Sequence, residues 1–136
     1  MRILALDLGD RWVGSAISDP LGITSRPYKT VPLSDLFDFL TGVIKTENIG
    51  MFLVGYPQTL RGTESEQTKT VIALYEKIKE AFPTINVLLC DERFTSKQAA
   101  QLKKASNKDE KLLQHSVAAA LILTTYLDLL QFQKNE

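Results

Sequence analysis

Acidic residues stand at the ends of two apolar segments of the chain. Asp7 directly follows the apolar run 3–6, and the pair Asp91 and Glu92 directly follows the apolar run 85–90. Burying an ionised carboxylate is costly unless it is hydrogen-bonded, paired or bound to a metal. Asp7 therefore either accepts hydrogen bonds from the turn that begins at Gly9 or binds a ligand, and its position alone leaves both interpretations open.

The second acidic segment, 91–96, combines two acids with an arginine. Adjacent residues of a strand point to opposite faces, so only one of Asp91 and Glu92 can reach a given site. Arg93 can neutralise a carboxylate or contact a phosphate with two hydrogen bonds. Taken alone, the segment is more simply a polar loop leading into a helix that Ser96 caps.

His115 is the only histidine of the chain. At helical spacing it shares a face with Ala119, Ile122 and Tyr126, so a buried core histidine is the commoner interpretation of such a position. Its small neighbours would let it approach a sheet closely, and imidazole is also a competent metal ligand.

Two glycine-containing segments suggest anion contacts. Gly9 and Gly14 would let the backbone approach a phosphate closely, although a turn also favours glycine. The segment 55–64 joins a predicted strand to a predicted helix, and Arg61 lies within it. Backbone N–H groups at a helix start bind anions, but the spacing here matches neither a P-loop nor a dinucleotide fingerprint.

These candidates form one chemical arrangement when they are combined. Two acids at strand ends and a polar group on a helix are the kind of donors that gather around a divalent cation. Two such cations about 4 Å apart can activate a water and stabilise a leaving oxygen in phosphodiester cleavage.

The elements that must position these residues follow from the hydrophobic pattern. Strands are expected at 2–7, 12–18, 23–31, 51–55 and 85–90, with tight turns joining the first three into an antiparallel meander. Pro27 places the third strand at an edge or a bulge. Helices are expected at 34–44, 64–82, 96–104 and 111–133, with Ser34 as the first N-cap. The chain thus predicts one α/β domain over 1–136, a five-stranded mixed sheet with helices on both faces.

Composition is that of an ordinary globular protein. Sixteen basic and sixteen acidic residues cancel, which excludes a whole-molecule cationic field but leaves a local basic face open. No uninterrupted apolar run reaches the length of a membrane span, and a single cysteine, Cys90, fits a reducing cytoplasm.

Four segments of the chain resemble, in order, the motifs of the YqgF family, also called RuvX, a branch of the RNase H-like fold related to the RuvC resolvases. The segments are LALDLGDRWVGSAISD, LVGYPQTLRGTESEQ, DERFTS and HSVAAALILTTYLD. The resemblance covers nearly the whole chain. It implies an RNase H-like nuclease domain in which Asp7 and Glu92 are metal-binding acids. The third acid of the family pattern falls at His115, so this chain departs from the pattern there.

The leading hypothesis is a cytoplasmic endonuclease that depends on Mg²⁺ or Mn²⁺, with Asp7, Glu92 and His115 as catalytic and metal-binding residues. The resemblance implies processing of the 5′ end of pre-16S rRNA, and an older inference for the family is Holliday junction resolution. Backbone phosphates are expected to contact Arg11, Arg61, Arg93 and Lys97. The expected partners are pre-rRNA or branched DNA and a ribosomal precursor particle, with no membrane, and the protein as a monomer or homodimer.

Two other hypotheses remain. The histidine at the third acidic position and the neutral net charge also suit a non-catalytic nucleic-acid-binding module on the same fold. The Asp-x-Gly start also resembles sugar kinases and Hsp70-like ATPases, but those enclose a nucleotide between two such domains, and 136 residues hold one.

Overall fold

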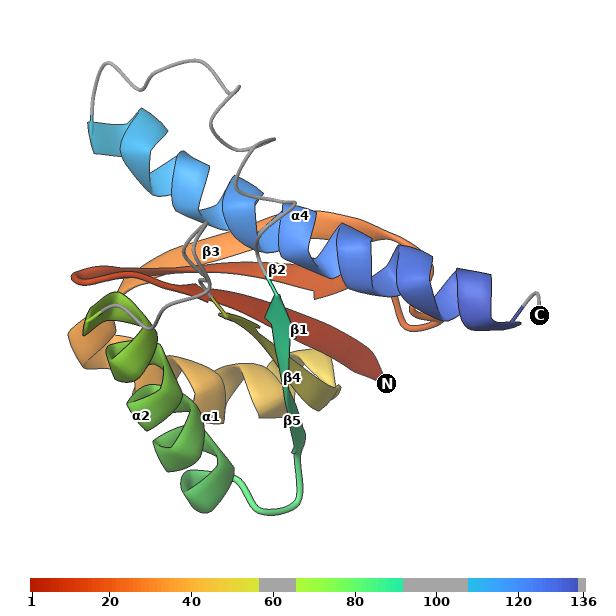
Figure 1. The fold of residues 1–136 in the computed structure, drawn as a ribbon, viewed down its shortest axis with the longest axis horizontal. Coiled ribbons are helices and arrows are strands. Elements are labelled where there is room, and N and C mark those ends of the chain that lie inside the picture. Colours follow the sequence, from red (N-terminus) through yellow and green to blue (C-terminus); the bar gives the residue numbers. More distant parts are fainter. Residues whose placement is uncertain (57–65, 92–107, 135–136) are drawn as a thin grey trace.

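The computed structural model describes residues 1–56, 66–91 and 108–134. A five-stranded mixed sheet with strand order β3-β2-β1-β4-β5 lies between helices (Figure 1). Strands β1 (Arg2–Leu8), β2 (Trp12–Ser18) and β3 (Ser25–Pro32) form the predicted antiparallel meander, and β4 (Ile49–Tyr56) and β5 (Asn86–Asp91) extend it in parallel from β1. Parallel strands point the same way, so β1, β4 and β5 have their carboxyl ends at the same end of the sheet.

Strand β1 is the middle strand of the sheet and has buried side chains on both faces. Alternate side chains of a strand point to opposite faces. Leu4, Leu6 and Leu8 belong to one apolar cluster, whereas Ile3 and Ala5 belong to another on the opposite face. The third strand, β3, lies at the sheet edge, and its pairing with β2 shifts register between Gly14 and Ala16. The edge position and the irregularity are those that Pro27 predicts.

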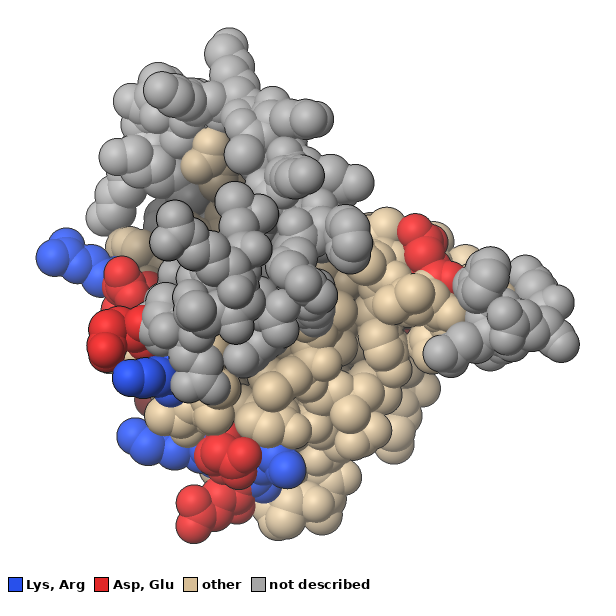
Figure 2. Space-filling view, viewed as in Figure 1, with Lys and Arg blue, Asp and Glu red and all other residues tan. Residues whose placement is uncertain are grey.

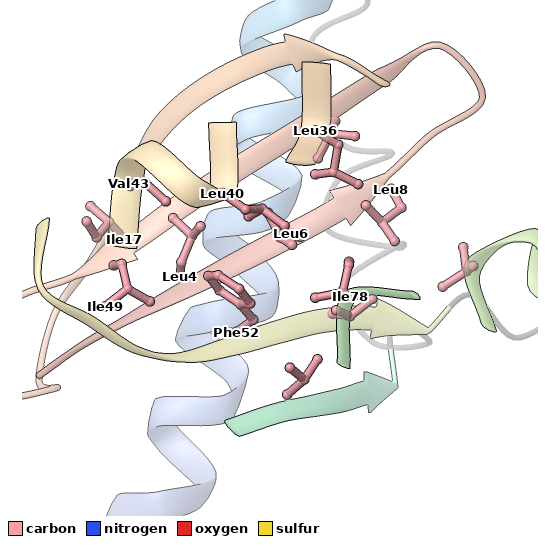
Figure 3. Close-up of a cluster of buried hydrophobic side chains, with 14 residues drawn as sticks. Leu4, Leu6, Leu8, Ile17, Leu36, Leu40, Val43, Ile49, Phe52 and Ile78 are labelled. Carbon is pink, nitrogen blue, oxygen red and sulfur yellow. The ribbon is translucent and has the colours of Figure 1, made fainter. Parts of the chain in front are cut away.

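Helices α1 (Leu36–Glu47) and α2 (Glu66–Ala81) cover one face of the sheet. Their apolar residues meet those of β1 and β4 in the cluster that Figure 3 shows. Its largest fully buried side chains include Phe52, Leu40 and Ile78. These helices therefore leave the face that carries Ile3 and Ala5 to another element.

The prediction that Ser34 caps the first helix is wrong. Leu33–Asp35 form a short 3₁₀ helix, η1, so Ser34 lies inside that turn. Asp35 takes the N-cap position of α1 and makes no side-chain capping hydrogen bond. At the other end, Asn48 adopts a left-handed conformation with φ of 54° and ends the helix, a role that asparagine takes more readily than most residues.

Helix α4 (Lys108–Lys134) covers the other face of the sheet and starts three residues before its predicted beginning. Its inner face is buried on the sheet through Ser116, Ala119, Ile122, Leu123 and Leu127. Over Leu113–Gln131 the helix also has the length and mean hydropathy, 1.3, of a membrane span, although no uninterrupted apolar run does. A core helix of a globular protein meets the same criterion, and this one packs along the sheet. The helix predicted at 96–104 lies outside the described residues.

Candidate active site

Asp7 lies at the carboxyl end of the central strand and faces helix α4. The alternation of β1 places Asp7 on the same side as Ile3 and Ala5, whose cluster includes the buried residues of α4. Across the sheet, Asp7 pairs with Gly14 of β2, and Gly14 in turn pairs with Thr30 of β3. The Asp7 side chain is 23% exposed, so its carboxylate is partly screened from water yet open to a ligand.

His115 reaches Asp7 from the helix. Its Nδ1 lies 3.9 Å from Asp7 Oδ2, and its side chain is 33% exposed. The ring also borders the turn after β1, since a Cβ placed on Gly9 would lie 3.6 Å from His115 Cε1. The structure thus brings together two residues from opposite ends of the chain that the sequence singled out separately.

Gly14 explains how the helix comes so near. A Cβ at Gly14 would overlap the backbone carbonyl of His115 and lie 2.8 Å from His115 Cβ. No residue other than glycine leaves room for this contact of helix and strand backbones. The suggestion that Gly14 serves a close approach to phosphate therefore gives way to a packing role. At Gly9 the glycine serves the turn, because the Gly9 N–H donates to Trp12 O at 2.9 Å and a Cβ would crowd that same oxygen.

Two hydroxyl contacts tie α4 to the edge strand β3. Thr30 Oγ1 and Ser116 Oγ lie 2.6 Å apart in a hydrogen bond, and Ser116 is 4% exposed. One helical turn further on, Ser25 Oγ donates to the Ala120 carbonyl at 3.1 Å. The sequence offered no signal for these pairs beyond the position of Ser116 next to His115, because strand register and helix rotation decide which hydroxyls meet.

The spacing of Asp7 and His115 leaves room for a cation between them but does not by itself define one. A separation of 3.9 Å is too long for a hydrogen bond. Ligands of an octahedral ion with bonds of about 2.1 Å lie about 3 Å apart when adjacent and about 4.2 Å when opposite. The observed 3.9 Å lies between these two values, so only the donor types, a carboxylate oxygen and an imidazole nitrogen, match the metal that the resemblance implies.

The structure describes two of the three predicted metal ligands, Asp7 and His115. Among the described residues no group of three or more His, Cys, Asp or Glu side chains could hold a metal ion. Strand β5 ends at Asp91, at the same end of the sheet as Asp7, and β4 lies between β1 and β5. The next residue, Glu92, lies outside the described residues, so its role as second metal-binding acid remains a prediction.

The predicted phosphate contacts divide in the same way. Arg11 is exposed in the turn between β1 and β2, and its carbonyl accepts the Leu33 N–H at 2.8 Å, which fixes the backbone beside the site. Arg61, Arg93 and Lys97 lie outside the described residues. In Figure 2 basic and acidic side chains are interspersed on the side of the molecule where helix α2 lies, and further acidic side chains lie on the opposite side of the view. Charge on that part of the surface is mixed, in agreement with the balanced composition.

Comparison with known proteins agrees with this fold and identifies the family of the chain. A family model described as "RuvX: Holliday junction resolvase" matches residues 1–129. A relative from Sulfurihydrogenibium sp. (strain YO3AOP1), named "Putative pre-16S rRNA nuclease", is 39% identical over 96% of this chain and 92% of its own length. A relative of the same name from Dictyoglomus turgidum is 38% identical over 94% of both chains.

Among solved structures, RuvC of T. thermophilus in complex with Holliday junction substrate aligns with a TM-score of 0.56. The alignment has 15% identity and covers 93% of each chain, so it shows a shared fold. It confirms the predicted RNase H-like architecture, and the sequence relatives confirm the predicted family of nucleases. By the family match over 1–129 and by its relatives, the chain belongs to the RuvX family.

Proposed function

We propose that this protein is a divalent-metal-dependent endonuclease that processes the 5′ end of pre-16S rRNA. The observation that carries the proposal is the pairing of Asp7 and His115, with 3.9 Å between Oδ2 and Nδ1, at the carboxyl end of the central strand. Active sites of α/β sheets lie at such strand ends. The relatives' names supply the RNA substrate.

Asp7, Glu92 and His115 would hold the cation, Mg²⁺ or Mn²⁺. When bound, the cation lowers the pKa of a coordinated water and stabilises negative charge on the scissile phosphate. Asp7 contributes a full negative charge from the sheet, whereas His115 contributes a neutral donor from the helix. A site with one imidazole in place of a carboxylate carries one negative charge fewer, which weakens its hold on Mg²⁺ more than on Mn²⁺.

The protein's own groups also orient the substrate. Arg11 stands exposed in the turn that follows Asp7, where its guanidinium can bind a backbone phosphate next to the scissile one. Arg61, Arg93 and Lys97 are proposed to extend this phosphate contact. We place the reaction in the cytoplasm, on a ribosomal precursor particle, with the protein acting as a monomer or homodimer.

Holliday junction cleavage is the second candidate. The description of the matching family and the RuvC complex with a junction favour it. The RuvC likeness supports the fold only, and the sequence relatives carry an rRNA name, so the RNA substrate takes precedence. Both reactions hydrolyse a phosphodiester bond and would use the same site residues.

The test is a cleavage assay with purified protein on a pre-16S rRNA 5′ fragment and on a four-way DNA junction, each with Mn²⁺, Mg²⁺ or EDTA. We expect metal-dependent cleavage of the RNA and a loss of at least about 100-fold in Asp7→Asn, because the carboxylate charge disappears. Asp38→Asn is the matched control, since Asp38 is exposed on α1 across the sheet.

Full activity of Asp7→Asn would remove Asp7 from the site. Cleavage of the junction alone would shift the function to resolution of branched DNA. Salt-dependent RNA binding with no cation bound and no cleavage would identify a binding module instead.

A further inference from the structure

We propose that Thr30 and Ser116 are positioning residues of the nuclease site, whose hydroxyl–hydroxyl bond sets the rotation of helix α4 that brings His115 beside Asp7. The inference rests on the proposed function of the Asp7–His115 site. The role argued for them acts through helix α4, which carries both Ser116 and His115.

The pair lies at the level of the site. Asp7, Gly14 and Thr30 form one row across strands β1, β2 and β3. Helix α4 crosses this row with His115 against Gly14, and the next residue, Ser116, bonds to Thr30 at 2.6 Å. The hydroxyl bond thus holds the helix at the row in which Asp7 and His115 meet.

Such a bond controls the rotation of helix α4 about its own axis. Consecutive residues of an α-helix are about 100° apart, so a Ser116 held toward β3 fixes the direction in which His115 projects toward β1. Gly14 sets the distance between helix and sheet, and Ile122, Leu123 and Leu127 hold the helix two or more turns further on. The hydroxyl bond is therefore the side-chain contact that restrains rotation at the level of His115. A rotation of about 15° would move an atom about 6 Å from the axis by about 1.5 Å.

A displacement of that size matters for catalysis. Misplacing a reacting group by about 1 Å can cost about 100-fold in rate. Residues that orient a metal ligand without binding the metal typically change metal affinity or activity by about 10-fold to 100-fold when replaced. We therefore expect the loss of the Thr30–Ser116 bond to weaken cation binding about tenfold while the fold persists.

Ser25 provides a matched control on the same interface. Its hydroxyl also ties β3 to α4, but to the Ala120 carbonyl, one turn beyond Ser116. Ser25 and Thr30 are both half-buried. Ser25→Ala removes the other hydroxyl bond between β3 and α4 and leaves the Thr30–Ser116 bond in place, so it separates general docking of the helix from placement of His115.

The experiment uses the single histidine as its probe. In the metal-free protein, NMR should show a nuclear Overhauser effect between His115 Hε1 and Gly9 Hα, because the ring lies against Gly9. Thr30→Val and Ser116→Ala should each lose or weaken this signal, and Thr30→Ser should retain it. Titration with Mn²⁺, followed by broadening of the His115 ring signals, should show affinity about tenfold lower in the first two variants and within about twofold of the parent in Thr30→Ser and Ser25→Ala.

The proposal is overturned if the His115–Gly9 signal and the Mn²⁺ affinity of Thr30→Val and Ser116→Ala match the parent. It is also overturned if Ser25→Ala changes both as much as they do. A parent that binds no Mn²⁺ and cuts no nucleic acid contradicts the proposed function. The metal-free His115–Gly9 signal would then still decide whether the hydroxyl pair places the ring.

Discussion

Replacing Gly14 by alanine would force helix α4 away from the sheet. The new Cβ would lie 2.8 Å from His115 Cβ and overlap the His115 carbonyl, whereas carbon atoms in contact sit about 3.5–4.0 Å apart. The overlap with the carbonyl is the larger one, so the helix must move by at least about 1 Å. A gap of that size forfeits at least about a quarter to a half of the contact energy of the side chains that face it.

The stability cost follows from what α4 buries. Ile122, Leu123 and Leu127 are each at most 4% exposed, and burying such a side chain contributes about 2 kcal/mol. Losing about a third of that from three side chains costs about 2 kcal/mol, which is within the usual range for overpacked sites. A domain of ordinary stability survives this loss, so Gly14→Ala should be folded but destabilised.

Urea unfolding followed by the fluorescence of Trp12, the only tryptophan, measures the effect. The midpoint should fall by about 1 M relative to the parent. Gly42→Ala is the control, because Gly42 lies in helix α1 with nothing within 4 Å of its Cβ position. Alanine there should raise the free energy of unfolding by about 0.5–1 kcal/mol. An unfolding midpoint of Gly14→Ala equal to that of the parent would refute the contact of the two backbones.

Three further predictions address the core, the pH dependence and the cation. Phe52→Ala should lower the free energy of unfolding by about 3–5 kcal/mol in the same urea assay, because Phe52 is fully buried in the cluster between the sheet and helices α1 and α2. A loss below about 1 kcal/mol would contradict that packing. The backbone N–H of Thr24, aided by that of Ile23, holds the pKa of Asp19 below its ordinary value of 3.8. This carboxylate therefore contributes stability above about pH 4 that is lost as the pH falls through its folded pKa. Asp19→Asn should flatten the acid limb of a stability–pH curve. An unchanged acid limb would contradict the hydrogen bonds from Ile23 and Thr24 to Asp19. His115→Asp should raise Mg²⁺ affinity relative to Mn²⁺ in calorimetric titration, because it restores a hard anionic oxygen ligand, and an unchanged ratio would remove His115 from the ligand set.

Most of the fold was readable from local pattern. Apolar runs and turn residues predicted all five strands, and Pro27 predicted the edge position of β3. These predictions succeed because strand alternation and turn chemistry depend on neighbours a few residues away. The prediction that Ser34 caps the first helix was wrong because the 3₁₀ turn before α1 depends on how the chain leaves β3, which the local pattern does not specify.

Of the predicted site residues, the structure describes Asp7, Arg11 and His115, and the sequence did not indicate how the first and last of these are brought together. Asp7 and His115 stood out by residue type and position, and the family motifs placed them in one nuclease. For Gly14 the sequence left a phosphate contact and a turn both open, and neither included its packing role, because only the structure shows the His115 backbone against it. The Thr30–Ser116 bond had no sequence signal, since its partners are 86 residues apart.

The sequence by itself determined the order of the described strands and helices and the family to which the chain belongs. These depend on periodicity, on turn residues and on motif order, all of which are properties of the chain alone. The tertiary structure decided that Asp7 and His115 meet at 3.9 Å and that Gly14, Thr30 and Ser116 hold the helix which brings them together. The physical reason is that the distance between strand and helix is set by close packing and register, which combine residues distant in sequence.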